Sequence, residues 1–193
     1  DWMAAGLSDL VPEGVQPTNL RQLDLWEEFA SVELRGRPHP ILTEGWRKLR
    51  ADVPSDGPPA LCWGDCRLGN IFWEDATPVC LTDFEGVTIA PAEFDLGWFL
   101  SFDRWIHEAC GNPRLDGEPT REDLVGLYAE ALGRRPEGVW WQEVFGAARY
   151  CAIVVRVINR LEERGALPTG SDLYLAGGVT ECLQMLLDEQ DPY

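Results

Sequence analysis

The sequence predicts a mostly α-helical α+β domain with one small β-hairpin near its middle. Apolar residues recur at helical spacing over residues 18–52 and 92–189, whereas residues 60–86 contain two short β-prone runs. A chain of 193 residues is long enough to bury a substantial core. We therefore expect residues 1–193 to form a single domain.

Two helices are expected in the first helical segment, after a loop-rich start. Asn19 is expected to cap a helix over about residues 20–34, and a second helix is expected over about residues 42–51. Gly36 and two following prolines separate them. The first helix has an apolar stripe at helical spacing, made by Leu20, Leu23, Trp26, Phe29 and Ala30.

The predicted hairpin consists of the β-prone runs Ile71–Trp73 and Val79–Leu81, with the turn-rich spacer 74–78 between them. An antiparallel hairpin brings its two open ends together. Asn70 comes just before the first run and Asp83 just after the second. We therefore expect these two oxygen-bearing side chains to lie side by side.

Four residues around the hairpin have the chemistry of phosphoryl transfer. Asp65 and Asn70 form the pattern D-x-x-x-x-N, and Asp83 follows after the hairpin. Carboxylate and amide oxygens suit Mg²⁺, and a further aspartate can accept a hydroxyl proton. Arg67 could neutralise charge on the transferred phosphoryl group. Alternatively, an aspartate after a strand caps a turn, and an arginine beside acids only pairs with them.

The stretch Leu61–Leu96 resembles the aminoglycoside phosphotransferase and choline kinase family, which shares the protein-kinase-like fold. The segments WGDCRLGNI, LTDFEG and PAEFDLGWFL are most similar to one branch. That branch includes bacterial aminoglycoside-phosphotransferase-like proteins and the kinase domain fused to certain acyl-CoA dehydrogenases. Trp63 stands where the family usually has a histidine, and we expect it to keep a packing role. The matching residues are Gly64-Asp65, Asn70, Asp83-Phe84-Glu85 and Asp95-Leu96.

The resemblance implies a role for each matching residue. Asp65 is implied as the catalytic base, and Asn70 and Asp83 as Mg²⁺ ligands. Asp95 is implied to support the catalytic loop through the loop's backbone. Arg67 occupies the place where protein kinases have a lysine that contacts phosphate.

An acceptor pocket in this fold would be built from the helices after Asp95, and the sequence offers four candidate substrate contacts. Glu85 is either a supporting or substrate contact or a solvated loop residue. The helix expected from Ala92 is apolar most of the way round and is predicted to be buried. The other three candidates lie along it: Trp98, Asp103 and Arg104.

Three more helices are expected towards the C-terminus, over about residues 120–133, 139–164 and 172–188. Thr120 is expected to cap the first of them, with Asp123 in a capping box. Asn159 and Arg160 interrupt the apolar face of the long middle helix. They either line a substrate pocket or face solvent.

Composition limits the partners and the compartment. The net charge of −17 argues against nucleic acid and anionic membranes, because both need a basic face. It is compatible with a cationic acceptor, or it serves solubility alone. No apolar run is long enough to span a membrane, and the N-terminus lacks the features of a signal peptide.

The cysteines give no sign of a metal site. There are six, without a C-x-x-C pair, and His39 and His107 are isolated, so we expect no zinc site. Cys80, Cys151 and Cys182 fall in apolar stretches and are expected to be buried. We expect a reducing, cytoplasmic compartment.

Several parts of a complete kinase are missing from the sequence. No G-x-G-x-x-G precedes the catalytic stretch, the single lysine is Lys48, and nothing before residue 60 resembles a β-sheet. We therefore expect the chain to correspond to the C-terminal lobe of the protein-kinase-like fold. The N-terminal nucleotide-binding lobe is absent, and the chain is expected to be a fragment that is inactive alone.

The leading prediction is an ATP- and Mg²⁺-dependent O-phosphotransferase that acts on a small-molecule hydroxyl acceptor. The alternative is a non-catalytic binding or regulatory module built on the same lobe. Aminoglycosides, macrolides, choline-like alcohols, sugars and hydroxyacyl thioesters all stay open as acceptors, and so does ATP against GTP. The two functions differ in whether ADP is released with any acceptor.

Overall fold

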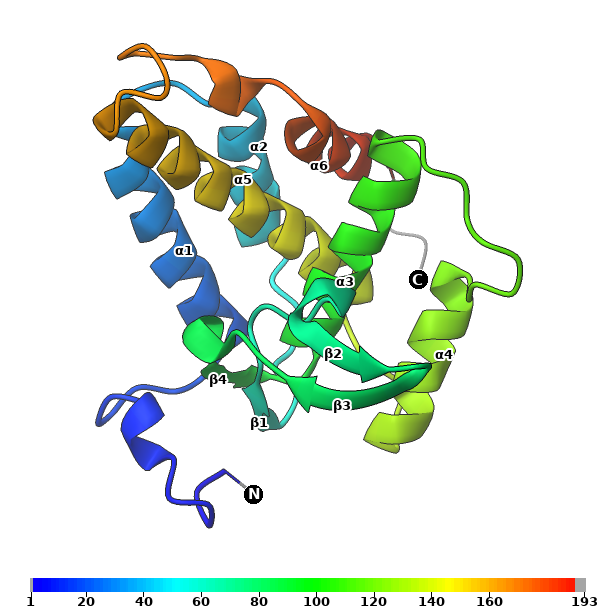
Figure 1. The fold of residues 1–193 in the computed structure, drawn as a ribbon. Helices are drawn as coiled ribbons and strands as arrows, with labels where there is room; N and C mark the ends of the chain where they lie inside the picture. Colours follow the sequence, from blue (N-terminus) through cyan, green and yellow to red (C-terminus); the bar gives the residue numbers. More distant parts are fainter. Residues whose placement is uncertain (1, 190–193) are drawn as a thin grey trace.

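The computed structural model describes residues 2–189, which form six α-helices and two small antiparallel sheets (Figure 1). The helices are α1 (Asn19–Leu34), α2 (Pro40–Ala51), α3 (Glu93–Arg104), α4 (Arg121–Leu132), α5 (Val139–Glu163) and α6 (Gly178–Asp188). The strands are β1 (Pro59–Cys62), β2 (Ile71–Glu74), β3 (Thr77–Leu81) and β4 (Thr88–Pro91). The mostly helical α+β prediction is confirmed. No helix in the described residues is both long and apolar enough to cross a membrane.

The hairpin is present, but its turn is tighter than predicted. β2 pairs with β3 in antiparallel register from Ile71 opposite Leu81 to Glu74 opposite Thr77. Most of the expected spacer belongs to the strands, and only two residues make the turn. Asp75 can occupy it because aspartate tolerates the left-handed backbone found there, with φ of 53°.

The second sheet was not predicted, because the sequence indicated only one small β-hairpin. β1 pairs with β4, with Pro59 opposite Pro91 and Cys62 opposite Thr88. Each strand has four residues and a proline at one end, so local β-propensity is weak. The pairing joins the two ends of residues 59–91 and closes this stretch into one unit.

The start of α1 also differs from its prediction. Thr18, not Asn19, is the cap: its backbone is extended, and its side-chain oxygen accepts a hydrogen bond from the backbone N–H of Arg21. Asn19 is instead the first residue of the helix and is buried. Its side-chain oxygen accepts a hydrogen bond from Gln142 Nε2 at 2.7 Å, which joins α1 to α5.

Two other helix starts were placed wrongly. α2 begins at Pro40 rather than about Leu42, with the His39 ring as its cap. The last helix begins at Gly178 rather than at residue 172, because a short 3₁₀ turn and Gly177, with φ of 97°, precede it. By contrast, Thr120 forms the predicted capping box at the start of α4.

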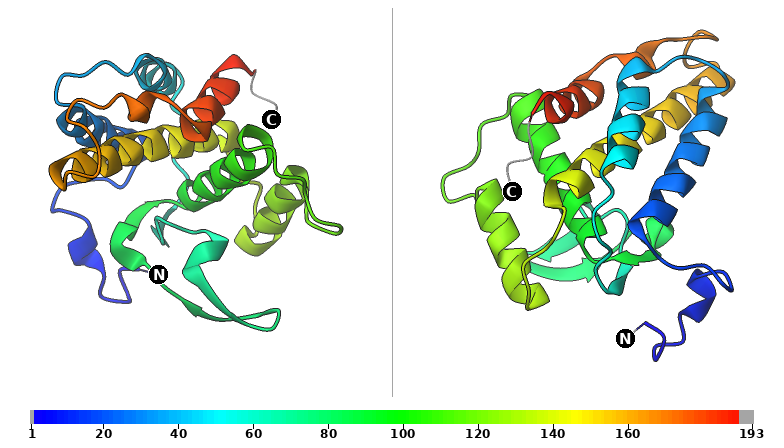
Figure 2. Two further views of the ribbon diagram at one scale, coloured as in Figure 1. Left: turned by 45° about the horizontal axis from the view of Figure 1, so that its top comes forward. Right: turned by 180° about the vertical axis from the view of Figure 1, so that it is seen from behind.

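α5 is the centre of the core. It packs against α1, α2, α3 and α6, and the views in Figure 1 and Figure 2 show it running through the middle of the helical layer. α3 approaches it at Gly97, where an added Cβ would lie 2.3 Å from the backbone carbonyl of Gln142. The main core includes Leu23, Leu42, Leu49, Phe94, Val144, Phe145, Ala148, Cys151, Leu183 and Leu186.

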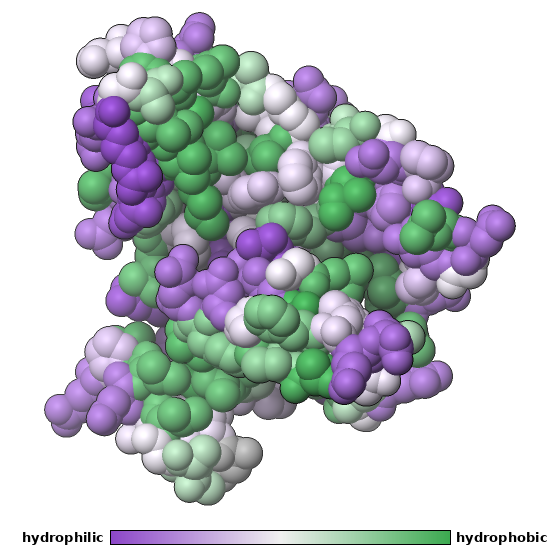
Figure 3. All heavy atoms as spheres, in the orientation of Figure 1, coloured by the Kyte–Doolittle hydropathy of each residue, from purple (hydrophilic) through white to green (hydrophobic). Residues whose placement is uncertain are grey.

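The β2–β3 hairpin is hydrophobic but exposed. Figure 3 shows apolar residues on the face of the molecule where the hairpin lies. The exposed fractions of Phe72 and Val79 are 63% and 56%. Cys80, expected to be buried, is exposed with them, whereas Cys151 and Cys182 are buried as predicted.

Candidate active site

The loop before Asp65 is held by Asp95, in the first turn of α3. One carboxylate oxygen of Asp95 accepts a hydrogen bond from the N–H of Trp63 at 2.7 Å, and the other from the N–H of Gly64 at 2.9 Å. Burial raises the pKa of Asp95, although these two N–H groups oppose the rise. The carboxyl group therefore fixes the loop through its backbone.

We expect Asp95→Ala to lower the free energy of unfolding by about 2 kcal/mol or more, because two loop N–H groups lose their acceptor. Urea denaturation measures this loss. Glu122→Ala is the matched control, since Glu122 is also a first-turn acid but lies exposed on α4. Equal stability of the two variants would contradict the supporting role.

Gly64 brings the loop against the segment after the hairpin. Its φ is +85°, and a Cβ at this position would lie 1.9 Å from the carbonyl oxygen of Gly86. The obstacle is backbone, which cannot move aside like a flexible side chain. The glycine therefore lets the two segments touch and places Asp65 next to the end of the hairpin.

The carboxylate of Asp65 is oriented by three donors. Trp98 Nε1 donates to Oδ1 at 2.9 Å, and Asn70 Nδ2 donates to Oδ2 at 2.6 Å. Arg67 Nε lies 3.1 Å from Oδ2. Trp98, predicted as a possible substrate contact, thus holds Asp65 directly. This ion pair with Asp65 agrees with the alternative left open for Arg67, in which the arginine pairs with a neighbouring acid.

Asn70 and Asp83 lie at the open end of the hairpin. The N–H of Thr82 donates to the carbonyl oxygen of Asn70 at 3.0 Å, so the residue after Thr82 is a neighbour of Asn70. Trp63 Nε1 donates to the carbonyl of Thr82 at 2.8 Å and to that of Asp83 at 3.2 Å. Trp63 therefore does more than pack, because it fixes the backbone that carries Asp83.

The free oxygens at this end suit a hard cation. The amide nitrogen of Asn70 is used by Asp65, which leaves its side-chain oxygen without a hydrogen bond among residues 2–189. Asp83 is exposed, has a left-handed backbone with φ of 61°, and its carboxylate likewise makes no hydrogen bond in the described chain. Oxygen donors of this kind are the ligands that Mg²⁺ prefers.

A pocket of about 730 Å³ opens beside Asp65, between the loop that carries this residue and helices α1, α3 and α5. Four of the predicted site residues line it: Asp65, Arg67, Glu85 and Trp98. Arg160, which the sequence assigned either to a pocket or to solvent, lines its outer part and is exposed. The remaining lining residues are Trp26, Phe29, Gly64, Gly86, Phe102, Trp105, Arg149, Tyr150, Ile153, Arg156 and Val157.

Arg149 on α5 was missed by the sequence analysis. It is 2% exposed, and its Nη2 donates to the carbonyl of Gly64 at 3.0 Å. Its guanidinium lies over the rings of Phe94 and Trp98, at 4.1 and 4.5 Å from their centres. Burial lowers its pKa to about 10. The signal in the sequence that could have identified Arg149 is its position within the apolar stripe of a long helix.

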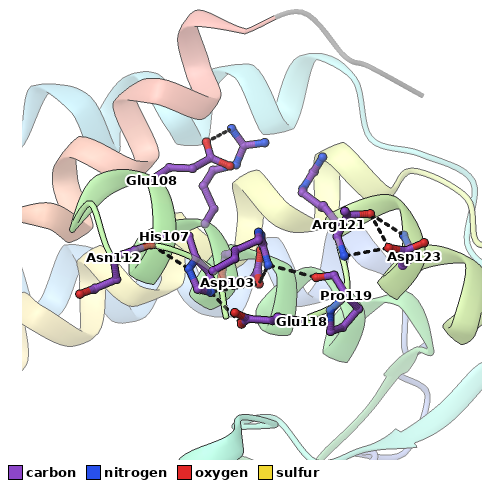
Figure 4. Close-up of polar contacts among 12 residues, drawn as sticks. Asp103, His107, Glu108, Asn112, Glu118, Pro119, Arg121 and Asp123 are labelled. Carbon is purple, nitrogen blue, oxygen red and sulfur yellow. Dashed lines mark hydrogen bonds and ion pairs between the residues drawn. The ribbon is translucent and has the colours of Figure 1, made fainter. Parts of the chain in front are cut away.

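Asp103 lies elsewhere, in a polar cluster near the end of α3 (Figure 4). Arg104 follows it as the last residue of α3. Asp103 accepts a hydrogen bond from Arg114 Nη1 at 2.9 Å, and nearby His107 Nε2 lies 3.0 Å from Glu118. Arg104 is 4% exposed and pairs with acidic side chains. Neither of the two predicted substrate contacts lines the pocket. Asp103 joins α3 to the segment that follows it, whereas Arg104 joins α3 to Glu143 on α5 and to Glu189 after α6.

Comparisons with known proteins identify a family and a fold for this chain. The family model described as "Phosphotransferase enzyme family" matches residues 5–133. A solved structure of a proposed aminoglycoside phosphotransferase from Ralstonia eutropha superposes with a TM-score of 0.71 at 20% sequence identity. The match covers 97% of this chain and 57% of that protein, so this chain spans little more than half of its length. At this identity the likeness is one of fold.

Proposed function

Because the chain belongs to the phosphotransferase enzyme family, we propose that it carries the catalytic groups of an ATP- and Mg²⁺-dependent O-phosphotransferase. The acceptor is the hydroxyl group of a small molecule. One observation carries the proposal: the Asp65 carboxylate is oriented by Trp98, Asn70 and Arg67 at the wall of a pocket large enough for a small molecule.

Asp65 is the proposed proton acceptor. Its carboxylate lines the pocket, so a hydroxyl group bound there can donate its proton to Asp65 as the oxygen attacks phosphorus. Trp98 and Asn70 hold the carboxylate in place before the acceptor binds, which reduces the cost of orienting it. Arg67 is 40% exposed, so its cation is also accessible to a phosphoryl group.

Asn70 and Asp83 are the proposed Mg²⁺ ligands, through the side-chain oxygens that make no hydrogen bond within residues 2–189. When bound, Mg²⁺ neutralises the phosphates of the nucleotide. The chain's contribution is to hold the two ligands together: the hairpin ladder places the residues as neighbours, and Trp63 fixes the backbone at Asp83.

Asp83→Ala in the full-length protein is expected to lower the affinity for Mg·ATP at least about tenfold, because the metal loses a charged ligand. Isothermal titration calorimetry measures this change. Asp75→Ala is a close control, since Asp75 is also exposed and also has a left-handed backbone, at the opposite end of the hairpin. Equal affinities in the two variants would remove Asp83 from the metal site.

Part of the nucleotide site is proposed to lie outside these 193 residues, in an N-terminal lobe. The sequence contains no G-x-G-x-x-G pattern, which covers the ATP phosphates in protein kinases. The chain spans 57% of its structural neighbour. The exposed apolar hairpin, with Phe72 and Val79, offers a surface for such a lobe. In this proposal the 193 residues form the C-terminal catalytic lobe.

A further inference from the structure

The pocket beside Asp65 has the opposite charge to the chain around it. Its lining holds four arginines and two carboxylates, Asp65 and Glu85, and therefore has a formal charge of +2. The whole chain has a net charge of −17. Charge of one sign concentrated in a cleft attracts ligands of the other sign. The pocket therefore differs in charge from the chain as a whole, whose acidity is compatible with a cationic acceptor or serves solubility alone.

Two of the four arginines keep hydrogen-bonding capacity for a ligand. Arg67 pairs with Asp65, and Arg156 pairs with Glu33 at 3.0 Å. The side chain of Arg160 makes no hydrogen bond or ion pair in the described part of the chain. Arg149 is almost fully buried, and its Nε and Nη1 have no hydrogen-bond partner among residues 2–189. Such groups favour an anionic or strongly accepting ligand.

The walls between these arginines are apolar. They are formed mainly by aromatic and branched side chains from α1, α3, α5 and the π-helical turn that follows α3, namely Phe29, Phe102, Trp105, Tyr150, Ile153 and Val157. Phe102 and Tyr150 stack with ring centres 4.7 Å apart, which gives one wall a flat aromatic surface. A polyhydroxylated, polycationic molecule would bury little of the apolar surface of these walls, whereas an apolar chain or ring would cover it.

The arginines are arranged along one face of α5, because Arg149, Arg156 and Arg160 are separated by seven and four positions. At about 1.5 Å per residue, roughly 16 Å of helix separates the first from the last. Arg149 contacts Gly64, beside the catalytic carboxylate, so Arg160 marks the far end of the pocket.

We propose that the acceptor is an elongated hydroxy acid, with its hydroxyl group at Asp65, an apolar body along the aromatic wall and its carboxylate at Arg160. The inference rests on the proposed phosphotransferase function. In the reaction, the hydroxyl oxygen forms a bond to the γ-phosphorus of ATP, and the bond from that phosphorus to the β,γ-bridging oxygen breaks. Asp65 takes the hydroxyl proton, and ADP keeps the bond electrons.

Binding without nucleotide tests the inference apart from catalysis. Hydroxydecanoate, decanediol, aminodecanol and kanamycin are titrated calorimetrically into the full-length protein without Mg·ATP. Hydroxydecanoate is expected to bind about tenfold more tightly than decanediol, and the two cationic compounds more weakly still. Binding of decanediol, aminodecanol or kanamycin as tight as that of hydroxydecanoate, or no binding of any probe, would overturn the proposal.

Charge removal at Arg160 gives the second measurement. Arg160→Gln is expected to lower hydroxydecanoate affinity about tenfold and leave decanediol affinity unchanged. Arg164→Gln is the matched control, because Arg164 is exposed at the end of the same helix and does not line the pocket. Equal affinities in both variants would remove Arg160 from the site. Failure of the phosphotransferase function would appear differently, as absent ADP release despite normal probe binding.

Discussion

Replacing Asp65 by asparagine is expected to lower kcat by about a thousandfold, within the range that general-base groups contribute. The amide has nearly the size and shape of the carboxylate, and its oxygen can still accept the hydrogen bond from Trp98 Nε1, while the donors at Oδ2 lose their acceptor. It cannot take the proton of the acceptor hydroxyl. Affinity for Mg·ATP is expected to stay near that of the wild type, because the proposed metal ligands are other residues.

ADP release by the full-length protein in the presence of acceptor measures this effect. Asp116→Asn makes the same chemical change at an exposed loop position and is expected to keep full activity. An Asp65→Asn variant that turns over within tenfold of wild type would remove Asp65 from the role of base. A wild-type protein that releases no ADP with any acceptor would instead favour the non-catalytic binding module.

Gly97→Ala is expected to lower the free energy of unfolding by about 3 kcal/mol or more. The new methyl group would lie 2.3 Å from both the carbonyl carbon and the carbonyl oxygen of Gln142, far inside contact distance. These atoms belong to the backbone of α5, so they move only if the helix moves. α3 and α5 would separate, and Trp98 would shift away from Asp65 with its helix.

Gly126→Ala provides the control within the same protein. Gly126 lies on exposed α4, and a Cβ added there meets no atom within 4 Å. Alanine has the higher helix propensity, so this variant is expected to gain up to about 1 kcal/mol. Urea denaturation of both variants makes the comparison, and opposite signs are expected. Similar changes in the two would show that the α3–α5 approach tolerates an added methyl group.

The hairpin could be predicted from the sequence because the residues that determine it are close together in the chain. Two β-prone runs and a turn-rich spacer are adjacent in the chain, and they place Asn70 near Asp83 whatever the rest of the fold does. The β1–β4 pairing lacks such a signal, because the two strands are short and distant in sequence, and only tertiary packing selects their register. Local patterns therefore predicted one sheet and missed the other.

Polar residues on buried helices were harder to interpret. Asp103 and Arg104 were candidate pocket residues because they lie on the helix after Asp95. Asp103 instead pairs with Arg114 in the following segment, and Arg104 pairs with Glu143 on α5. Arg149 interrupts an apolar helix and does line the pocket. Spacing alone does not separate these cases, because the difference lies in which distant element faces each side chain.

The exposed hairpin also determines how the chain behaves in solution. Within the described residues, β2 and β3 pair only with each other, so each strand has an outer edge with unpaired backbone groups beside apolar side chains such as Phe72 and Val79. Such edges favour association between copies of a chain. We expect the apparent molar mass of the 193-residue chain, measured by light scattering, to rise with concentration despite its high net charge. Hydrogen exchange is expected to be faster at these two strands than in the buried helices.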